Sequence, residues 1–216
     1  MALTPTDMQA WWNQEAGTSP KTAILSGQSD LSDAEFFASG TAWFDQFAAF
    51  AASAGVDLRG ETALDFGCGM GRMTRALTAR YGKVTGIDVS DAMIRLANQR
   101  RISAATEFTH VLAPPWPMDD RSVDLAFSTI AVQHVAPPHN ARAVEELFRV
   151  SRGLVLFDAP SHKLAPDAPD TEAQGIFLLP FEDVARIARA WDFELMALRN
   201  FPTTATRQYQ YLYKAR

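Results

Sequence analysis

The stretch Ala63–Leu77, ALDFGCGMGRMTRAL, places three glycines within five residues, between an apolar run and a helix-forming run. The apolar run Thr62–Phe66 is typical of a buried strand, and the apolar spacing over Arg72–Tyr81 predicts a helix. Glycine accepts positive φ and allows a ligand to approach the backbone closely. The stretch therefore predicts a strand, a tight turn and a helix, with a ligand held at the turn.

The rest of the chain continues the alternation of strands and helices. Further strands are predicted at Lys83–Asp88, Thr106–Val111, Val123–Ser128, Gly153–Asp158, Phe193–Asn200 and Arg207–Lys214. Helices are predicted at Pro5–Glu15, Ser32–Ala54, Ser90–Arg101, Pro138–Val150 and Pro180–Trp191, the last with Trp191 facing inward, and Pro160–Gly175 is predicted to be a loop or insertion. This order predicts an α/β doubly wound parallel sheet, and the final hairpin adds an antiparallel strand at or near one edge.

Length and composition are typical of a globular protein without a basic surface stripe. The chain has 216 residues, a net charge of −5 and a single cysteine. We expect one structural domain with a helical cap over residues 1–55 and a ligand-binding part over residues 56–216. The absence of a Lys/Arg-rich run speaks against nucleic acid as a partner, and the absence of a long apolar run speaks against a membrane span. We further expect a cytoplasmic monomer or homodimer, no disulfide within the chain and no metal site.

Two residues around the glycine turn decide which ligand suits it. Arg72 stands where the third glycine of a dinucleotide-binding G-x-G-x-x-G turn belongs. Asp65 would repel a phosphate but would attract an ammonium group, unless the turn amides already satisfy its carboxylate. Asp88 closes the next strand, where it can accept both ribose hydroxyls of a nucleotide, NAD included, or can cap a helix. Together they favour a nucleoside with an amino-acid end, S-adenosylmethionine.

Three motifs in order carry a family resemblance: ALDFGCGMGRMTRAL, VTGIDVSDAMIRLA and PMDDRSVDLAFSTIAVQHV. They resemble the motifs of class I S-adenosylmethionine-dependent methyltransferases, and more narrowly the bacterial group of small "methyltransferase domain" proteins. The resemblance spans about Gly60–Asp158, and the upstream QAWWNQEAG and AEFFASG resemble the N-terminal cap of that group. It implies a seven-stranded Rossmann-like sheet with strand order 3-2-1-4-5-7-6, the seventh strand antiparallel.

The resemblance also implies the residues that bind the cofactor. The glycines would pass under its methionine part, Asp65 would lie near its amino group, Asp88 would hold the ribose and Met93 would cover the adenine. The full implied set is Asp65, Gly67, Cys68, Gly69, Gly71, Arg72, Asp88, Val89, Met93, Leu112, Ala113 and Ser128. One departure is that Val111-Leu112-Ala113 offers no carboxylate for the adenine amino group, for which backbone groups or Trp116 would substitute.

The acceptor side carries fewer signals. His134 follows the fourth predicted strand and is the candidate general base; alternatively it shapes the pocket or bonds the following loop. His110, His139 and His162 are weaker candidates. Trp12 and Phe37 would form part of a lid over the cofactor and the acceptor, or simply pack the N-terminal helices.

These features leave three functions open. The first is a methyltransferase for a small organic acceptor, by O- or N-transfer, with a protein acceptor still possible. The second is a protein that binds S-adenosylmethionine or S-adenosylhomocysteine without turnover. The third is an NAD(P)-dependent oxidoreductase, which Arg72 and the final hairpin disfavour.

Overall fold

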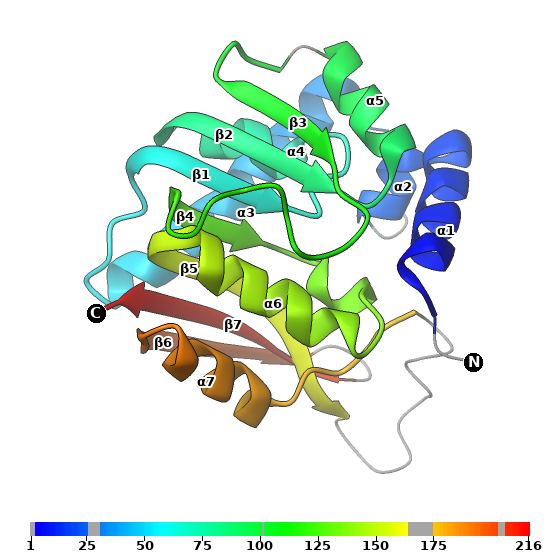
Figure 1. The fold of residues 1–216 in the computed structure, drawn as a ribbon. Helices are drawn as coiled ribbons and strands as arrows, with labels where there is room; N and C mark the ends of the chain where they lie inside the picture. Colours follow the sequence, from blue (N-terminus) through cyan, green and yellow to red (C-terminus); the bar gives the residue numbers. More distant parts are fainter. Residues whose placement is uncertain (1–2, 26–30, 101, 164–174, 203–205) are drawn as a thin grey trace. The chain divides into compact units, whose positions relative to one another are not determined.

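A computed structural model describes residues 3–25, 31–100, 102–163, 175–202 and 206–216, with the backbone alone at residues 201 and 202. Its seven strands form one sheet in the order β3-β2-β1-β4-β5-β7-β6 (Figure 1). The predicted doubly wound fold and strand order are thereby confirmed. The chain divides into two compact units, residues 4–112 and residues 113–216 with the first three residues.

The first unit holds the glycine turn. Its elements are α1 (Pro5–Thr18), α2 (Pro20–Leu25), α3 (Asp33–Ser53), β1 (Gly60–Phe66), α4 (Arg72–Leu77), β2 (Tyr81–Asp88), α5 (Asp91–Arg100) and β3 (Thr106–His110). β2 pairs in parallel with both β1 and β3. Thr4 and Ser32 begin α1 and α3 with capping boxes, which satisfy free N–H groups of the first turn. The parallel strands end together, so their carboxyl ends form one ligand-facing edge.

One prediction for this unit was wrong, and one element was not predicted. The helix after the glycine turn ends at Leu77 instead of Tyr81, because the last turn tightens into i→i−3 bonds such as that from the Arg80 N–H to the Leu77 carbonyl. Tyr81 instead begins β2, opposite Gly60. The short helix α2 was not predicted; it follows α1 almost directly, with Ser19 between them.

The second unit carries the other four strands. Its elements are β4 (Val123–Ser128), the 3₁₀ turn η1 (Val132–His134), α6 (His139–Val150), β5 (Ser151–Lys163), α7 (Phe181–Ala190), β6 (Phe193–Pro202) and β7 (Thr206–Ala215). β4 pairs in parallel with β5, and β7 runs antiparallel between β5 and β6. α6 and α7 lie side by side in Figure 1. Phe148 of α6 packs edge-on against Phe157, Phe193 and Tyr213 of three strands, which fixes the helix on the sheet.

The end of β5 differs from its prediction. Pro160–Lys163, expected to open a loop, continues β5 because these residues pair with Thr206–Gln208 of β7. Residues 164–174 of the expected insertion, and residues 203–205 of the expected turn after Pro202, lie outside the described part of the chain. η1 was not predicted, and Trp191 is half-buried instead of facing inward.

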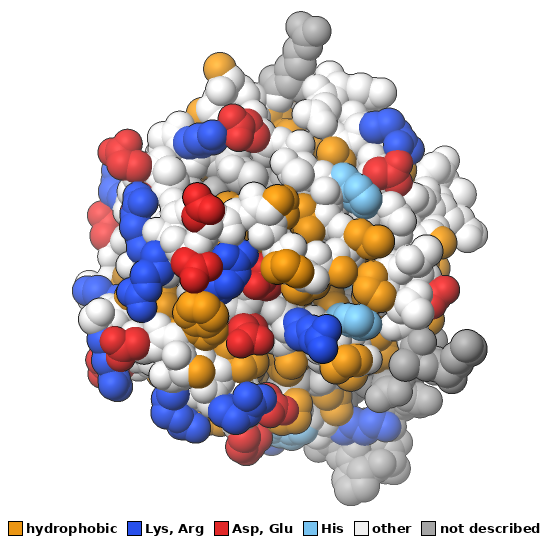
Figure 2. All heavy atoms as spheres, viewed as in Figure 1, with side chains coloured by type: hydrophobic (Ala, Val, Ile, Leu, Met, Phe, Trp, Pro, Cys, Tyr) orange, Lys and Arg blue, Asp and Glu red, His pale blue; other side chains and the backbone are white. Residues whose placement is uncertain are grey.

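Within the ranges described, no helix is long and apolar enough to cross a membrane. Acidic and basic side chains are interspersed on the face drawn in Figure 2, with hydrophobic side chains between them. That face therefore offers no patch of a single charge sign to a polyanion.

Candidate functional site

The glycine turn has a backbone that few other residues could adopt. Gly67, Gly69 and Gly71 have φ angles of 75°, 52° and 85°, all in the left-handed region. The N–H groups of Gly67 and Cys68 donate to the carbonyl of Ile87 at 2.9 and 3.1 Å, which ties the turn to β2. The three glycines thus allow the chain to leave β1 and enter α4 within a few residues, and the Cys68 thiol is buried there.

Asp88 is built into this turn. Its Oδ2 accepts a hydrogen bond from the Gly69 N–H and its Oδ1 accepts one from the Ser90 N–H, both at 2.8 Å. Burial raises the pKa of this carboxyl, against the lowering effect of the two N–H donors. α5 is capped by Ser90, whose Oγ accepts from the Met93 N–H, so the capping alternative for Asp88 does not apply. Each carboxylate oxygen of Asp88 has a further lone pair for a ligand.

Asp65 lies one strand away and is completely enclosed. Its Oδ2 accepts a hydrogen bond from the Thr74 hydroxyl at 2.6 Å, so a side chain of α4, and not the turn amides, satisfies it. Burial raises the pKa of Asp65 to about 7, although Thr74 and the Arg72 charge act in the opposite direction. Burial also lowers the pKa of Arg72, and its buried Nε has no hydrogen-bond partner among the described residues. A buried carboxylate and a buried guanidinium therefore adjoin the turn, and each can accommodate a charged ligand group.

The raised pKa of Asp65 predicts a pH dependence of stability. The unfolded chain releases this proton near pH 4 and the folded chain near pH 7, so the free energy of unfolding should fall as pH rises between these values, by at most about 1.4 kcal/mol per pH unit. In Asp65→Asn this component is missing, and Asn can still accept from Thr74. Relative to the wild type, Asp65→Asn should be more stable at pH 8 than at pH 4, measured by urea unfolding.

The control for this measurement is a surface carboxylate. Asp57 pairs with Arg59 at 3.3 Å, and both side chains are about two-thirds exposed. Asp57→Asn should follow the wild-type pH profile, because a screened surface pair contributes little. Parallel profiles for the wild type and Asp65→Asn would contradict the assignment of the pKa to Asp65.

The N-terminal helices cover the turn. Ala16, Phe36, Phe37, Met70 and Met93 form one buried apolar cluster, against which Trp12 and Ile24 pack. Ile24 Cδ1 lies 2.9 Å from where a Cβ on Gly69 would stand. The predicted lid residues Trp12 and Phe37 thus lie in one cluster with Met93. This arrangement agrees both with a lid over the cofactor and with ordinary packing of the N-terminal helices.

α1 also docks on the start of α5 through polar contacts. Asn13 Oδ1 accepts from the Ser90 hydroxyl at 2.7 Å and from the Ala92 N–H at 3.2 Å, and its Nδ2 donates to Asp91 at 2.7 Å. His110 Nε2 lies 3.0 Å from both Gln9 Nε2 and the Val89 carbonyl. These contacts flank Asp88 on its carboxyl-terminal side. Asn13 was not predicted as a site residue, because no helical pattern distinguishes it from a surface residue.

In the second unit, His134 has both ring nitrogens engaged. Nδ1 lies 2.8 Å from the Gly175 carbonyl and Nε2 lies 3.0 Å from Gln133 Nε2. Burial lowers the pKa of His134, and the bond to Gly175 opposes this. The contact with the Gly175 carbonyl agrees with the alternative role predicted for His134, a hydrogen bond to the following loop.

The remaining predicted residues occupy varied environments. Ser128 and Trp116 are buried, and the backbone N–H of Trp116 donates to Glu146 at 2.6 Å, while Leu112 is 40% exposed. Ala113 and Val89 are half-buried. No carboxylate stands at Val111–Ala113, as the sequence shows, and an adenine contact there would have to come from the backbone.

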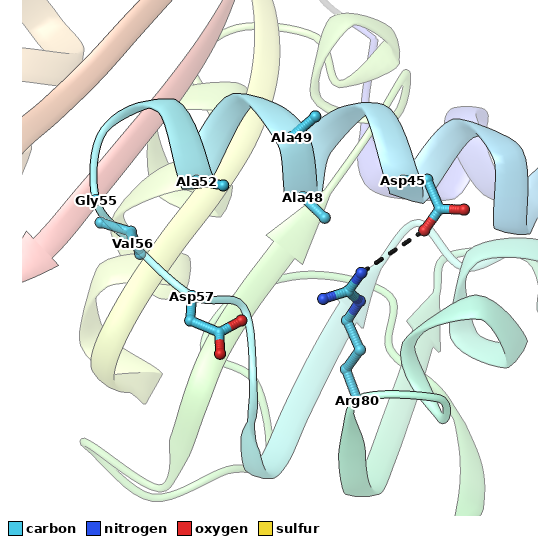
Figure 3. A pocket seen from close by; sticks show the side chains of 8 residues that line it. All are labelled: Asp45, Ala48, Ala49, Ala52, Gly55, Val56, Asp57 and Arg80. Carbon is cyan, nitrogen blue, oxygen red and sulfur yellow. Dashed lines mark ion pairs between the residues drawn. The ribbon is translucent and has the colours of Figure 1, made fainter.

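A hollow of about 520 Å³ lies elsewhere in the first unit. Figure 3 shows the side chains that line it. It is lined by Asp45, Ala48, Ala49, Ala52, Gly55, Val56, Asp57 and Arg80, with Asp45 and Arg80 paired at 3.7 Å. These residues belong to α3 and to the segments that precede β1 and β2. The hollow is therefore at the amino ends of the strands, opposite the end where such sheets bind ligands. Across the described ranges, no three His, Cys, Asp or Glu side chains are grouped to hold a metal ion.

Comparison with known proteins gives matches over the same region. Residues 63–153 match the family described as "Methyltransferase domain". Malonyl-[acyl-carrier protein] O-methyltransferase of Salmonella typhimurium is 34% identical over 138 residues, which is 60% of this chain and 53% of that protein. The chain thus spans about half the length of the curated relatives it matches.

Solved structures share the fold across nearly the whole chain. Magnesium protoporphyrin IX methyltransferase from Synechocystis PCC 6803 with bound SAH has a TM-score of 0.72 at 14% identity, covering 98% of this chain and 99% of that one. The [4+2]-cyclase SpnF also has a TM-score of 0.72, at 16% identity, covering 100% and 97%. The glycine turn and the strand order agree with these matches: residues 63–153 match the methyltransferase domain family, and the chain has the fold of solved methyltransferases.

Proposed function

We propose that the protein is an S-adenosylmethionine-dependent methyltransferase for a small organic acceptor, by O- or N-transfer. The observation that carries the proposal is the pair of buried carboxylates, Asp65 and Asp88, on either side of three left-handed glycines. A buried carboxylate is costly unless a partner compensates it. The ammonium group and the ribose hydroxyls of this cofactor would supply such partners.

The cofactor would be held by residues of the turn and of the next strand. Gly67, Gly69 and Gly71 would pass under the methionine part and Asp65 would face its ammonium group. Arg72 Nε, which has no partner in the part of the chain that the structure describes, would favour its carboxylate. Asp88 would accept from the ribose hydroxyls. The wider set stays as predicted, with Cys68, Val89, Met93, Leu112, Ala113 and Ser128 as further cofactor contacts and Trp12, Phe37, Trp116 and His134 toward the acceptor.

The bound cofactor supplies an activated methyl group on a sulfonium, from which in-line transfer needs alignment above all. The chain's contribution is then to orient the cofactor and to exclude water. Trp12, Ile24 and Phe37, packed with Met70 and Met93, form an apolar cover over the turn that would do both.

An oxygen acceptor is favoured over nitrogen. The relative from Salmonella typhimurium is named an O-methyltransferase of a malonyl group, which ends in a carboxylate. A carboxylate oxygen is already ionised and needs no general base. His134 in this structure has its Nε2 next to Gln133, which agrees with an acceptor that requires no proton removal, whereas an alcohol or phenol would need His134 as the base.

Calorimetry tests this proposal by measuring which ligands bind and whether a proton is released on binding. We expect S-adenosylmethionine and S-adenosylhomocysteine to bind, and NAD and NADP not to bind. Because an ammonium group lowers the pKa of a facing carboxyl, binding at pH 6.5 should release part of a proton from Asp65, seen as a dependence of the heat on buffer ionisation.

The control ligand is 5′-methylthioadenosine, which lacks the amino-acid end and should bind without that proton release. Asp65→Asn should likewise bind S-adenosylmethionine without it. Binding of the nicotinamide nucleotides alone would contradict the proposal. The same proton release with both ligands would mean that Asp65 does not face the amino group.

A binding or non-transferring role is the second candidate. It is favoured by one observation: a protein named a [4+2]-cyclase has this fold at the same TM-score as a methyltransferase. Cofactor binding without consumption, over a panel of carboxylic, phenolic and amine acceptors, would favour it. The division at residues 55 and 56, the cytoplasmic location and the monomeric or dimeric state stay predictions.

A further inference from the structure

A chain of polar side chains connects a buried carboxylate to His134. Asp158 of β5 is completely buried, and its Oδ1 lies 3.2 Å from Gln208 Nε2 of β7. Gln208 Nε2 also lies 3.0 Å from Gln133 Oε1, and Gln133 Nε2 lies 3.0 Å from His134 Nε2. The other ring nitrogen, Nδ1, lies 2.8 Å from the Gly175 carbonyl. We call Asp158, Gln208 and Gln133 the relay.

Only one assignment of donors and acceptors satisfies every contact of the relay while Asp158 is ionised. The carboxylate can only accept, so Gln208 must turn its amide NH₂ toward it. The second hydrogen of that NH₂ then donates to Gln133, which fixes the Gln133 carbonyl toward Gln208. The Gln133 NH₂ must therefore face His134, whose Nε2 can only accept.

The consequence for His134 is a fixed protonation pattern. The Gly175 carbonyl can only accept, so Nδ1 carries the proton, and Nε2 carries none because Gln133 donates to it. A proton on Nε2 would face the Gln133 NH₂. To remove that conflict, Gln133 would have to turn over, which places two NH₂ groups opposite each other at Gln208.

Asp158 also holds the backbone before His134. Its Oδ2 accepts from the Thr129 hydroxyl at 2.6 Å and its Oδ1 from the Ile130 N–H at 2.8 Å. Ile130 has a φ of 57°, a left-handed conformation that a β-branched residue adopts only when its surroundings impose it. Ile130 thus lies four positions before His134, and its N–H bonds the same carboxylate, Asp158, that begins the relay.

We propose that Asp158, Gln208 and Gln133 are positioning residues that hold His134 neutral, as the Nδ1–H form, with its ring fixed between Gln133 and Gly175. If the proposed methyl transfer is correct, this places a neutral, oriented imidazole at the carboxyl end of β4, where it would border the acceptor without taking the methyl group itself, because Gln133 holds its Nε2 lone pair. That functional meaning rests on the proposed function; the positioning itself does not.

Nuclear magnetic resonance of the histidine ring nitrogens tests the positioning directly. The full chain, labelled with ¹⁵N-histidine, has four histidines, and His134→Asn identifies the resonances of His134. We expect the wild-type ring to give the pattern of the neutral Nδ1–H tautomer from pH 7 to pH 8, where Asp158 is ionised even though burial raises its pKa to about 6. Neither cofactor nor acceptor is needed, so the result is independent of whether methyl transfer occurs.

Gln208→Glu is the decisive variant. A carboxyl group at position 208 that bonds Asp158 through a shared proton presents only an acceptor to Gln133, which would turn its NH₂ away from His134. The Gln133 carbonyl would then face Nε2, so His134 should become imidazolium at pH 7, with an upward shift of its titration. Gln208→Met, which removes the donor without adding charge, should also shift the titration upward, by a smaller amount.

The matched control is Gln210→Glu. Gln210 lies two residues further along β7, opposite Asp158 in the strand pairing, and is equally buried. Its side chain accepts from the guanidinium of Arg199, so the variant adds charge beside Asp158 without removing a hydrogen bond of the relay. The same change of charge there should leave the His134 resonances as in the wild type. The proposal is overturned if the wild type shows the Nε2–H tautomer, or if neither variant at position 208 moves the His134 titration beyond that of Gln210→Glu.

Discussion

Replacing Gly71 with alanine should lower the free energy of unfolding by about 2–5 kcal/mol, the largest single effect we expect. Two costs add at this position. Gly71 has a φ of +85°, where an alanine is strained by about 1–2 kcal/mol. A Cβ there would also stand 2.3 Å from Ile102 Cδ1 and 2.9 Å from Phe108 Cζ, so these side chains would have to move. Urea unfolding measures the difference.

Gly55→Ala separates the two costs. Gly55 has a similar φ of +73°, but nothing lies within 4 Å of where its Cβ would stand. It should therefore show the strain alone, about 1–2 kcal/mol. Equal losses for Gly55→Ala and Gly71→Ala would show that Ile102 and Phe108 yield without cost, and that overlap at the turn is unimportant.

Asp88→Ala should weaken the binding of S-adenosylhomocysteine by about 1–3 kcal/mol, through the loss of charge-assisted hydrogen bonds to the ribose. The same substitution leaves the N–H groups of Gly69 and Ser90 without their acceptor, so the turn itself loosens. Because 5′-methylthioadenosine keeps the ribose, its binding should weaken equally. Calorimetry with both ligands measures this.

The pattern of losses distinguishes the two carboxylates. Asp65→Asn should weaken S-adenosylhomocysteine alone, whereas Asp88→Ala should weaken both ligands. Glu107→Gln is the control, since Glu107 pairs with Lys83 at 3.0 Å on the exposed side of β3. Unchanged affinity in Asp88→Ala would show that the ribose lies elsewhere. A urea unfolding curve of each variant shows whether it is folded under the conditions of the binding measurement.

Local pattern was enough for most of the elements. The bounds of Val123–Ser128 were predicted to the residue, and those of β1, β2 and α5 within three residues at each end. The reason is that buried strands and amphipathic helices each have a characteristic spacing of apolar residues. The predicted boundaries were wrong where one element passes directly into the next. The helix pattern after the glycine turn runs on to Tyr81, yet pairing with Gly60 makes that residue a strand.

The candidate site divides in the same way. Asp65, Asp88 and the three glycines follow from spacing, because they stand at the end of a strand or in the turn that directly follows it. Thr74, Asn13, Gln133 and Gln208 were missed as site residues. The only sequence signal for Gln208 was its place among alternating tyrosines in a strand, where a buried polar side chain requires a partner that the sequence does not identify.

The sequence by itself determined the order of strands and helices, the left-handed turn that only glycines allow, and the carboxylate that closes the second strand. These depend on residues adjacent in the chain, whose conformational preferences act locally. Only the tertiary structure decided that Thr74 satisfies Asp65, that Asn13 bonds the first turn of α5 from another helix, and that Asp158 reaches His134 through Gln208 and Gln133. Those contacts join residues up to 79 positions apart, so their hydrogen bonds exist only once the sheet and its helices bring them together.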